Sequence, residues 1–184
     1  MRDYVSPRKR AQRTLELLQI GCKERLPWQE RRNPEHEEPI RTDAPIDVTD
    51  AICEWDYGEY EGLTSAEIKV LREKNGQGPW DIWRDGCPGG ESPEDVCRRL
   101  DAFIANIRET HHKNSFSGSN DPKVDVLVVA HGHILRAFAM RWIGKPLTET
   151  ALILEAGGVG TLSYEHHSVH EPAIILGGGF VVED

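Results

Sequence analysis

Residues 126–136 have the sequence Val-Leu-Val-Val-Ala-His-Gly-His-Ile-Leu-Arg. The near-continuous apolar run predicts a buried strand of a parallel sheet that ends at His131, and the residues after it predict a helix. In open α/β sheets, ligands bind beyond the carboxyl ends of the strands, where the N–H groups of the next helix favour negative charge. We therefore expect His131 to lie beside an anion.

Composition limits the classes of partner. The chain has 184 residues, 38% hydrophobic and 29% charged, which fits one domain with a modest core. Its formal net charge of −9, from 22 basic and 31 acidic residues, argues against a nucleic acid or an anionic membrane as a general partner. The positive charge of an anion site must therefore be local.

The cysteines favour a reducing compartment. Cys22, Cys53, Cys87 and Cys97 form no C-x-x-C pair, and the first residues do not resemble a signal peptide. No apolar run approaches the roughly 20 residues that span a bilayer. We expect a soluble, cytoplasmic protein with free thiols.

Three helix starts are recognisable. Ser6-Pro7 is typical of an N-cap followed by a first helical residue, Thr64 with Glu67 predicts a capping box and a helix to about Lys74, and Ser92-Pro93-Glu94-Asp95 is the strongest start. The expected inward positions are Ala11, Leu15 and Leu18, then Ile68 and Leu71, then Val96, Leu100, Phe103, Ile104 and Ile107.

The remaining segments alternate between loops, strands and one more helix. Residues 25–43 and 111–123 predict polar loops, 124–130, 160–164 and 173–176 predict strands, and 134–142 predict a helix that ends at 144–146. This alternation predicts an α/β fold, a three-layer α/β/α domain with a mainly parallel sheet.

The predicted strands are few for a covered parallel sheet. Tyr4 and Val5, immediately before the first helix, are typical of the end of a strand. We expect a leading strand and turn to be absent from this chain. Exposed sheet edges would then predict poor stability or self-association into a homo-oligomer.

Besides His131, three other residues are candidates for binding an anion or for catalysis. Arg10 lies in the first turn of its helix, where it either joins the helix N–H groups on an anion or belongs to a solvated basic run. Glu54 has aromatic neighbours that would raise its pKa, as a general acid requires, or else is one member of an acidic loop. Arg136 either holds a second anionic group or lies, like Arg141, on the wet face of its helix.

Other residues have two interpretations each. His133 offers its backbone N–H to a phosphate, although a buried, satisfied imidazole is the alternative for it and for His131. Trp80 and Trp83 either wall a pocket that Arg84 faces or simply pack. The histidines of Glu165-His166-His167-Ser168-Val169-His170 suggest zinc, but their place between two strands predicts a hairpin loop without metal.

Four runs occur in order along the chain: Ser6-Pro7-Arg8-Lys9-Arg10-Ala11, the stretch from Glu54 to Gly62, Gly89-Gly90-Glu91-Ser92, and Ala130-His131-Gly132. They resemble the S-P-x-x-R-A, E-x-x-x-G-x-x-E-G, G-G-E-S and second-histidine motifs of the histidine phosphatase superfamily, also called phosphoglycerate mutase-like. The resemblance implies that Arg10 binds phosphate, Glu54 protonates the leaving oxygen and His131 stabilises the transferring phosphoryl group.

Three further runs, at 79–87, 130–136 and 156–164, resemble the sedoheptulose bisphosphatase subfamily. By that resemblance Tyr57 and Arg136 contact a sugar phosphate. We expect the backbone at Gly132 and His133, with Arg10 and His131, to cradle the phosphate. The resemblance implies a small phosphorylated sugar as partner and no metal or other cofactor.

The family's first strand ends in R-H-G, whose histidine is the nucleophile, and the printed sequence contains no Arg-His-Gly. We therefore expect a single histidine phosphatase-like domain over residues 1–184, truncated at its N-terminus. The expected function is hydrolysis of a phosphomonoester such as sedoheptulose 1,7-bisphosphate. The alternatives are an inactive domain that binds phosphometabolites or a partner protein, a metal-dependent hydrolase using His166, His167 and His170, and a phosphoglycerate mutase.

Overall fold

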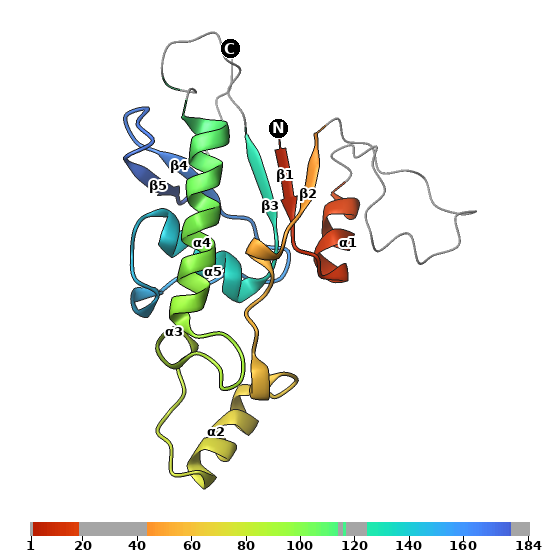
Figure 1. Ribbon diagram of the computed structural model, residues 1–184, viewed down its shortest axis with the longest axis vertical. Coiled ribbons are helices and arrows are strands. Elements are labelled where there is room, and N and C mark those ends of the chain that lie inside the picture. Colours follow the sequence, from red (N-terminus) through yellow and green to blue (C-terminus); the bar gives the residue numbers. More distant parts are fainter. Residues whose placement is uncertain (1, 19–43, 114–115, 117–124, 178–184) are drawn as a thin grey trace, which may run out of the picture.

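The computed structural model describes residues 2–18, 44–113, 116 and 125–177. Helices and strands alternate along most of the chain (Figure 1). Their bounds are β1 Arg2–Val5, α1 Lys9–Leu17, β2 Ile46–Val48, α2 Ser65–Lys74, α3 Ile82–Asp85, α4 Pro93–Ile107, β3 Val126–Val129, α5 Gly132–Trp142, β4 Thr161–Tyr164 and β5 Pro172–Ile175. The α/β class expected from the sequence is confirmed.

Three parallel strands form a sheet in the order β2-β1-β3. Within it, Val5 of β1 lies opposite Val48 of β2 and Val129 of β3. The prediction that Tyr4 and Val5 belong to a strand is confirmed, and that strand is the middle one. β2 is not predicted from the sequence, because its three residues are too few to show an alternating pattern.

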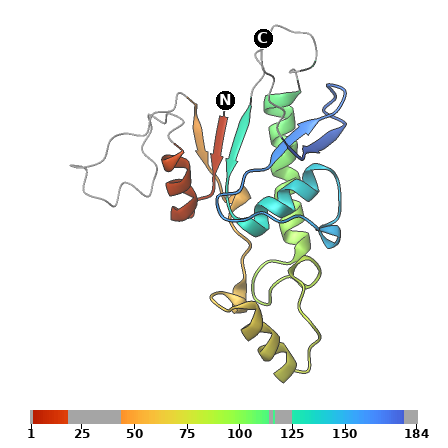
Figure 2. The same cartoon turned by 180° about the vertical axis from the view of Figure 1, so that it is seen from behind.

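Helices cover both faces of this sheet. Successive side chains of a strand point to opposite faces. Tyr4 packs edge-on against Phe103 of α4, with ring centroids 5.0 Å apart, whereas Val5 belongs to the core cluster of Leu15 from α1. Helix α1 therefore covers one face and α4, with α5, the other (Figures 1 and 2). This is the expected three-layer arrangement.

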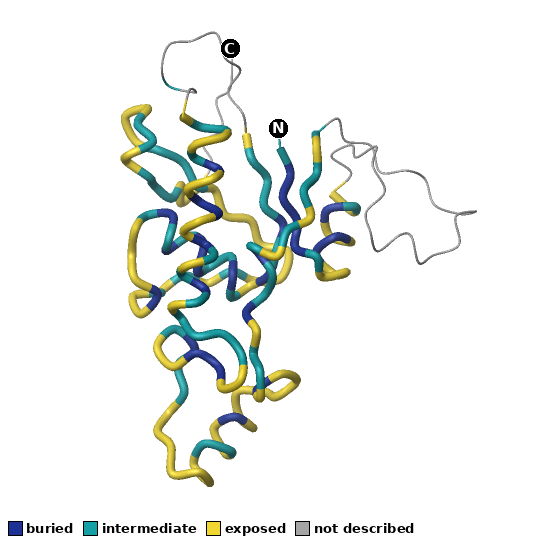
Figure 3. Tube along the Cα trace, in the orientation of Figure 1, coloured by how far each residue is buried: buried dark blue, intermediate teal, exposed yellow. Residues whose placement is uncertain are grey.

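The larger core lies on the α4 face of the sheet. All five apolar positions predicted for α4 are buried. Figure 3 shows buried residues, in dark blue, at intervals along α4 and α5. The predicted capping box at Thr64 begins α2, and the predicted N-cap Ser92 begins α4, where Asp95 completes a second capping box. The start of α4 matters for function, because the segment before it, with Glu91, packs against the candidate site.

Two predictions for the first helix are wrong, its start and one inward position. Helix α1 begins at Lys9 with Arg8 as its N-cap, whereas Ser6 is fully buried after β1, where its hydroxyl contacts the Arg8 N–H and His131 Nε2. Leu18, expected to face inward, follows the end of α1 and is 48% exposed.

The prediction that a loop begins at His111 is also wrong, because α4 continues into a π-helical turn, Arg108–His112. The two histidines have tyrosine partners on different strands: Tyr4 Oη lies 2.8 Å from His111 Nε2, and Tyr164 Oη lies 2.7 Å from His112 Nδ1. These distant partners explain why the helical backbone continues through polar residues.

The remaining strands, β4 and β5, pair antiparallel, with Thr161 opposite Ile175. They confirm the two predicted strands near residues 160–176. The loop predicted over 25–43 and residues 117–124 lie outside the described part of the chain. Among the helices that the structure describes, none combines the length and hydrophobicity that a membrane span requires.

Candidate functional site

The candidate site lies where β3 ends and α5 begins. His131, the N-cap residue of α5, is 6% exposed. Its Nδ1 accepts a hydrogen bond from Arg10 Nε at 3.0 Å, and its Nε2 lies 2.8 Å from Ser6 Oγ. Both partners follow β1, so the carboxyl ends of two parallel strands meet at this imidazole, as the sequence predicts for a ligand site.

The contact with Arg10 determines the protonation of His131. A guanidinium only donates hydrogen bonds, so Nδ1 is unprotonated and the neutral ring donates its Nε2–H to Ser6 Oγ. Burial, together with the positive charges of Arg10 and Arg8, lowers the pKa of His131 to about 4. The imidazole is therefore a neutral N–H donor at physiological pH.

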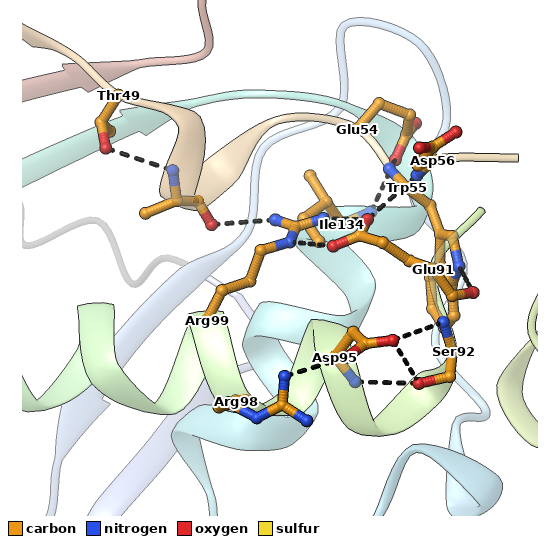
Figure 4. A network of polar contacts seen from close by, with 11 residues as sticks. Thr49, Glu54, Trp55, Asp56, Glu91, Ser92, Asp95, Arg98, Arg99 and Ile134 are labelled. Atoms are coloured by element: carbon orange, nitrogen blue, oxygen red, sulfur yellow. Dashed lines mark hydrogen bonds and ion pairs between the residues drawn. The ribbon is translucent and has the colours of Figure 1, made fainter. Parts of the chain in front are cut away.

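Glu54 reaches the same place from a loop between two 3-10 turns, Asp50–Ile52 and Gly58–Tyr60. Its Oε1 accepts hydrogen bonds from the backbone N–H of Ile134 at 3.1 Å and of Trp55 at 3.0 Å (Figure 4). Because Ile134 is the third residue of α5, the carboxylate lies at the positive end of that helix. Glu54 Oε2 makes no hydrogen bond within the described ranges and is free for chemistry.

Helix α5 supplies two more donors at this point. Gly132 and His133 are its first two residues, and N–H groups in that position have no partner inside a helix. In the part of the chain that the structure describes, neither N–H makes another hydrogen bond. Gly132 is exposed, so the end of the helix is accessible to an anion.

A polar network missed in the sequence fixes the loop that carries Glu54. Glu91 accepts two hydrogen bonds from Arg99, at 2.7 and 2.9 Å, and one from the Asp56 backbone N–H at 3.0 Å (Figure 4). Arg99 also donates to the carbonyl oxygen of Ala51 at 2.9 Å. The Gly-Gly-Glu-Ser run is the sequence signal of this network, because Glu91 is its third residue.

Two glycines permit the close packing of this network. A Cβ on Gly90 would lie 2.2 Å from the Asp56 carbonyl oxygen, and one on Gly58 would lie 2.3 Å from the Gly90 nitrogen. Gly58 also has φ +51°, a conformation that other residues rarely adopt. The two segments approach this closely because neither glycine has a side chain.

A second group of side chains surrounds the first turns of α5. Tyr57 Oη lies 2.7 Å from His133 Nδ1. Burial, with the negative charge of Glu54, raises the pKa of Tyr57. Burial also lowers the pKa of His133, so both groups are neutral and linked. The His133 side chain is thus engaged by Tyr57, while its backbone N–H makes no hydrogen bond within the described residues.

Arg136 lies beyond this pair. Its Nε donates to the Leu152 carbonyl oxygen at 2.6 Å, and its Cζ lies 4.9 Å from the centre of the Trp83 ring. Arg136 is thus half-buried rather than on a wet face. Arg84, which one interpretation of the sequence placed facing a pocket walled by Trp80 and Trp83, does not join this group: it is exposed, and its guanidinium pairs with Asp85 beside it.

The structure therefore brings all seven predicted site residues together around the first two turns of α5. They are Arg10, Glu54, Tyr57, His131, Gly132, His133 and Arg136. The histidines at 166, 167 and 170 are exposed in the β4–β5 turn, away from this group. Within the described residues, no three His, Cys, Asp or Glu side chains are arranged to hold a metal ion.

Comparison with known proteins shows the family of this chain. The sequence model of the histidine phosphatase superfamily (branch 1) matches residues 1–171. In an alignment 214 positions long, the chain is 33% identical to sedoheptulose 1,7-bisphosphatase of Saccharomyces cerevisiae. The alignment covers 97% of this chain and 73% of the yeast protein. It is 37% identical over 121 residues to an acid phosphatase of Mycobacterium tuberculosis, covering 65% of this chain and about half, 52%, of that protein.

A solved structure of an open reading frame from Mycobacterium tuberculosis superimposes with a TM-score of 0.67 at 29% identity, covering 95% of this chain and 70% of the other. The family match spans both the Arg10 and the His131 segments, and the yeast relative matches nearly the whole chain. The chain belongs to the histidine phosphatase superfamily.

Proposed function

We propose that this protein hydrolyses a phosphomonoester of a phosphorylated sugar, and that sedoheptulose 1,7-bisphosphate is the first substrate to test. The observation that carries the proposal is the convergence of Arg10, His131 and Glu54 at the N-terminus of α5. The name of the yeast relative supports the choice of sugar. The three groups supply a cation, a neutral N–H donor and a carboxyl group.

Arg10 and the end of α5 would bind the phosphoryl group. The Nε of Arg10 is bonded to His131, which leaves its two Nη groups for phosphate oxygens. The N–H groups of Gly132 and His133 would bind the same oxygens. Donors fixed in advance stabilise the charge that develops in the transition state, because they need no reorganisation.

Glu54 would protonate the leaving oxygen of the sugar. The N–H groups of Ile134 and Trp55 hold Oε1, which orients the carboxyl group and leaves Oε2 to carry and transfer the proton. Tyr57 and Arg136 would contact the rest of the sugar phosphate, because they lie beside Glu54 and His133 at the same end of α5.

A second candidate function is binding of a phosphometabolite without turnover. It is favoured by the contacts of His131, whose two ring nitrogens are both hydrogen-bonded, so neither is free to attack phosphorus. Hydrolysis through a phosphohistidine would need a different imidazole in line with the leaving oxygen.

One experiment separates these functions. We would measure hydrolysis of sedoheptulose 1,7-bisphosphate and of an aryl phosphate, and binding of inorganic phosphate by calorimetry, for the wild type and for Glu54→Gln. Hydrolysis predicts that Glu54→Gln lowers kcat by about 10²- to 10⁴-fold and leaves phosphate binding nearly unchanged. Glu59→Gln, an exposed carboxyl group nearby, is the matched control and should keep full activity.

The other outcomes are equally clear. Phosphate binding that Arg10→Ala abolishes, without turnover of either substrate, supports the binding domain. Turnover that is lost in EDTA contradicts both proposals, because neither uses a metal. A wild type that neither binds phosphate nor hydrolyses the two substrates also contradicts both.

A further inference from the structure

Trp83 joins the groups around the second part of the site, and the proposed function gives it no role. It lies on the four-residue helix α3 and is half-buried. Its ring centroid is 5.5 Å from that of His133 and 5.8 Å from that of Trp55, which it meets edge-on. Arg136 Cζ lies 4.9 Å from the same ring. One indole thus touches two residues of the proposed substrate site.

The guanidinium of Arg136 is held on two sides by groups that do not neutralise it. Trp83 covers one face and the Leu152 carbonyl oxygen accepts from Nε at 2.6 Å. Nη1 and Nη2 make no hydrogen bond and no ion pair within the described residues. Arg99 and Arg141, which are also half-buried, instead place Nε and Nη2 on the two oxygens of one carboxylate.

This difference matters because stacking and hydrogen bonding restrict the rotamers of a long side chain before a ligand arrives. A guanidinium fixed in advance loses less freedom for each hydrogen bond that it then forms. The aromatic face of Trp83 attracts the cation without occupying its N–H groups. The N–H groups on Nη1 and Nη2 of Arg136 therefore remain available for an anion from outside the chain.

We propose that Trp83 is a positioning residue that holds Arg136 as a second anion clamp beside the Arg10–His131 centre. The clamp favours sugars with two anionic groups over sugars with one. This proposal rests on the proposed function, because it places the first phosphate of the ligand at Arg10 and His131. Trp83 acts on the ligand through Arg136, whose guanidinium lies over its ring.

The test compares three probes by calorimetry: inorganic phosphate, sedoheptulose 7-phosphate and sedoheptulose 1,7-bisphosphate. Trp83→Leu removes the aromatic face and should weaken binding of the bisphosphate about tenfold, while the other two affinities change less than about twofold. Trp83→Phe keeps a smaller face and should show a selective loss of about threefold. The graded response follows the aromatic face rather than the bulk of the side chain.

Trp80→Leu is the matched control. Trp80 lies three residues earlier and is also half-buried, but its Nε1 donates to the Gly86 carbonyl oxygen at 2.8 Å and its ring packs on Tyr60. Its substitution should leave the three affinities unchanged. Because Trp83 acts through Arg136, the pair Trp83→Leu with Arg136→Met should bind the bisphosphate no more weakly than Arg136→Met alone.

Additive effects of the two substitutions, or equal loss for all three probes, would show a merely structural role and overturn the proposal. If circular dichroism shows that Trp83→Leu does not fold, the selective loss in Trp83→Phe decides, and its absence overturns the proposal. A wild type that binds phosphate, with unchanged selectivity in the variants, contradicts this proposal alone. A wild type that binds no phosphate contradicts the proposed function and this proposal together.

Discussion

Asp3 and Ser6 lie three residues apart, in β1 and just after it, and both are 0% exposed. Ser6 Oγ has two partners, the Arg8 N–H at 3.3 Å and His131 Nε2 at 2.8 Å. Among the residues that the structure describes, neither carboxylate oxygen of Asp3 has a hydrogen-bond partner. The comparison shows that burial of a polar group is supported at the site end of the strand and unsupported at the other end.

The surroundings explain this difference. The strand neighbours of Asp3 are Ile46 and Leu127, which pack into the apolar cluster of Val5 beneath α1. Burial there raises the pKa of Asp3. Glu91, in contrast, meets Arg99 and a backbone N–H. A buried carboxylate costs stability unless donors replace its hydration, so Asp3 should destabilise the fold while Glu91 holds the site loop.

Removing the partner of Glu91 should have the largest effect. Arg99→Met leaves the Glu91 carboxylate, whose side chain is 22% exposed, without its countercharge. The substitution should lower the free energy of unfolding by about 3–4 kcal/mol, measured by urea denaturation. Arg98→Met is the control, because Arg98 is 74% exposed, and should change stability by less than about 1 kcal/mol. Equal losses in the two variants would contradict the supporting role of Glu91.

His131 should produce a pH dependence of nearly that size. Its folded pKa is about 4, against roughly 6.5 in the unfolded chain. The unfolded state therefore binds more protons between these values, and stability falls by about 3 kcal/mol as pH is lowered through this range. In urea unfolding at several pH values, His131→Gln should lose this slope. The exposed His170→Gln should keep it, and an unchanged slope in His131→Gln would sink the assignment.

Asp3 should behave in the opposite way. Its raised pKa means that the folded state keeps a proton above the unfolded pKa, so its contribution to stability falls as pH rises above about 4. Asp3→Val should raise the free energy of unfolding by about 2 kcal/mol at pH 7, measured by thermal denaturation. Asp47→Val, which removes the half-buried partner of Arg2, is the control and should not stabilise. A less stable Asp3→Val variant would contradict the unsupported burial of Asp3.

Ser6→Ala should have the smallest effect. It leaves the Nε2–H of His131 without its acceptor and should cost about 1 kcal/mol of unfolding free energy. Ser65→Ala, at an exposed position of α2, should cost nothing measurable in the same denaturant titration. If Ser6→Ala leaves the free energy of unfolding unchanged, the hydrogen bonds of Ser6 do not support its burial, and the contrast between Ser6 and Asp3 is contradicted.

The parts of the fold that depend on nearby residues are predictable from the sequence. The caps at Thr64 and Ser92 involve residues three positions apart, and the apolar face of α4 repeats along one helix. Ser6 is misassigned as a cap because one of its two partners, His131, is 125 positions away and holds the serine at the end of the strand. The helical backbone at His111 is missed for the same reason, since its tyrosine partner lies on β1.

By itself, the sequence determined the strand-to-helix turn at His131, the class of fold and the types of residue that a phosphate site needs. Only the tertiary structure decided which of them meet. Arg10 reaches His131 across 121 positions, and Glu54 reaches Ile134 across 80. Parallel strands place their carboxyl ends at one edge, and the packing of helices and loops there decides which distant side chains touch. No local pattern encodes that choice.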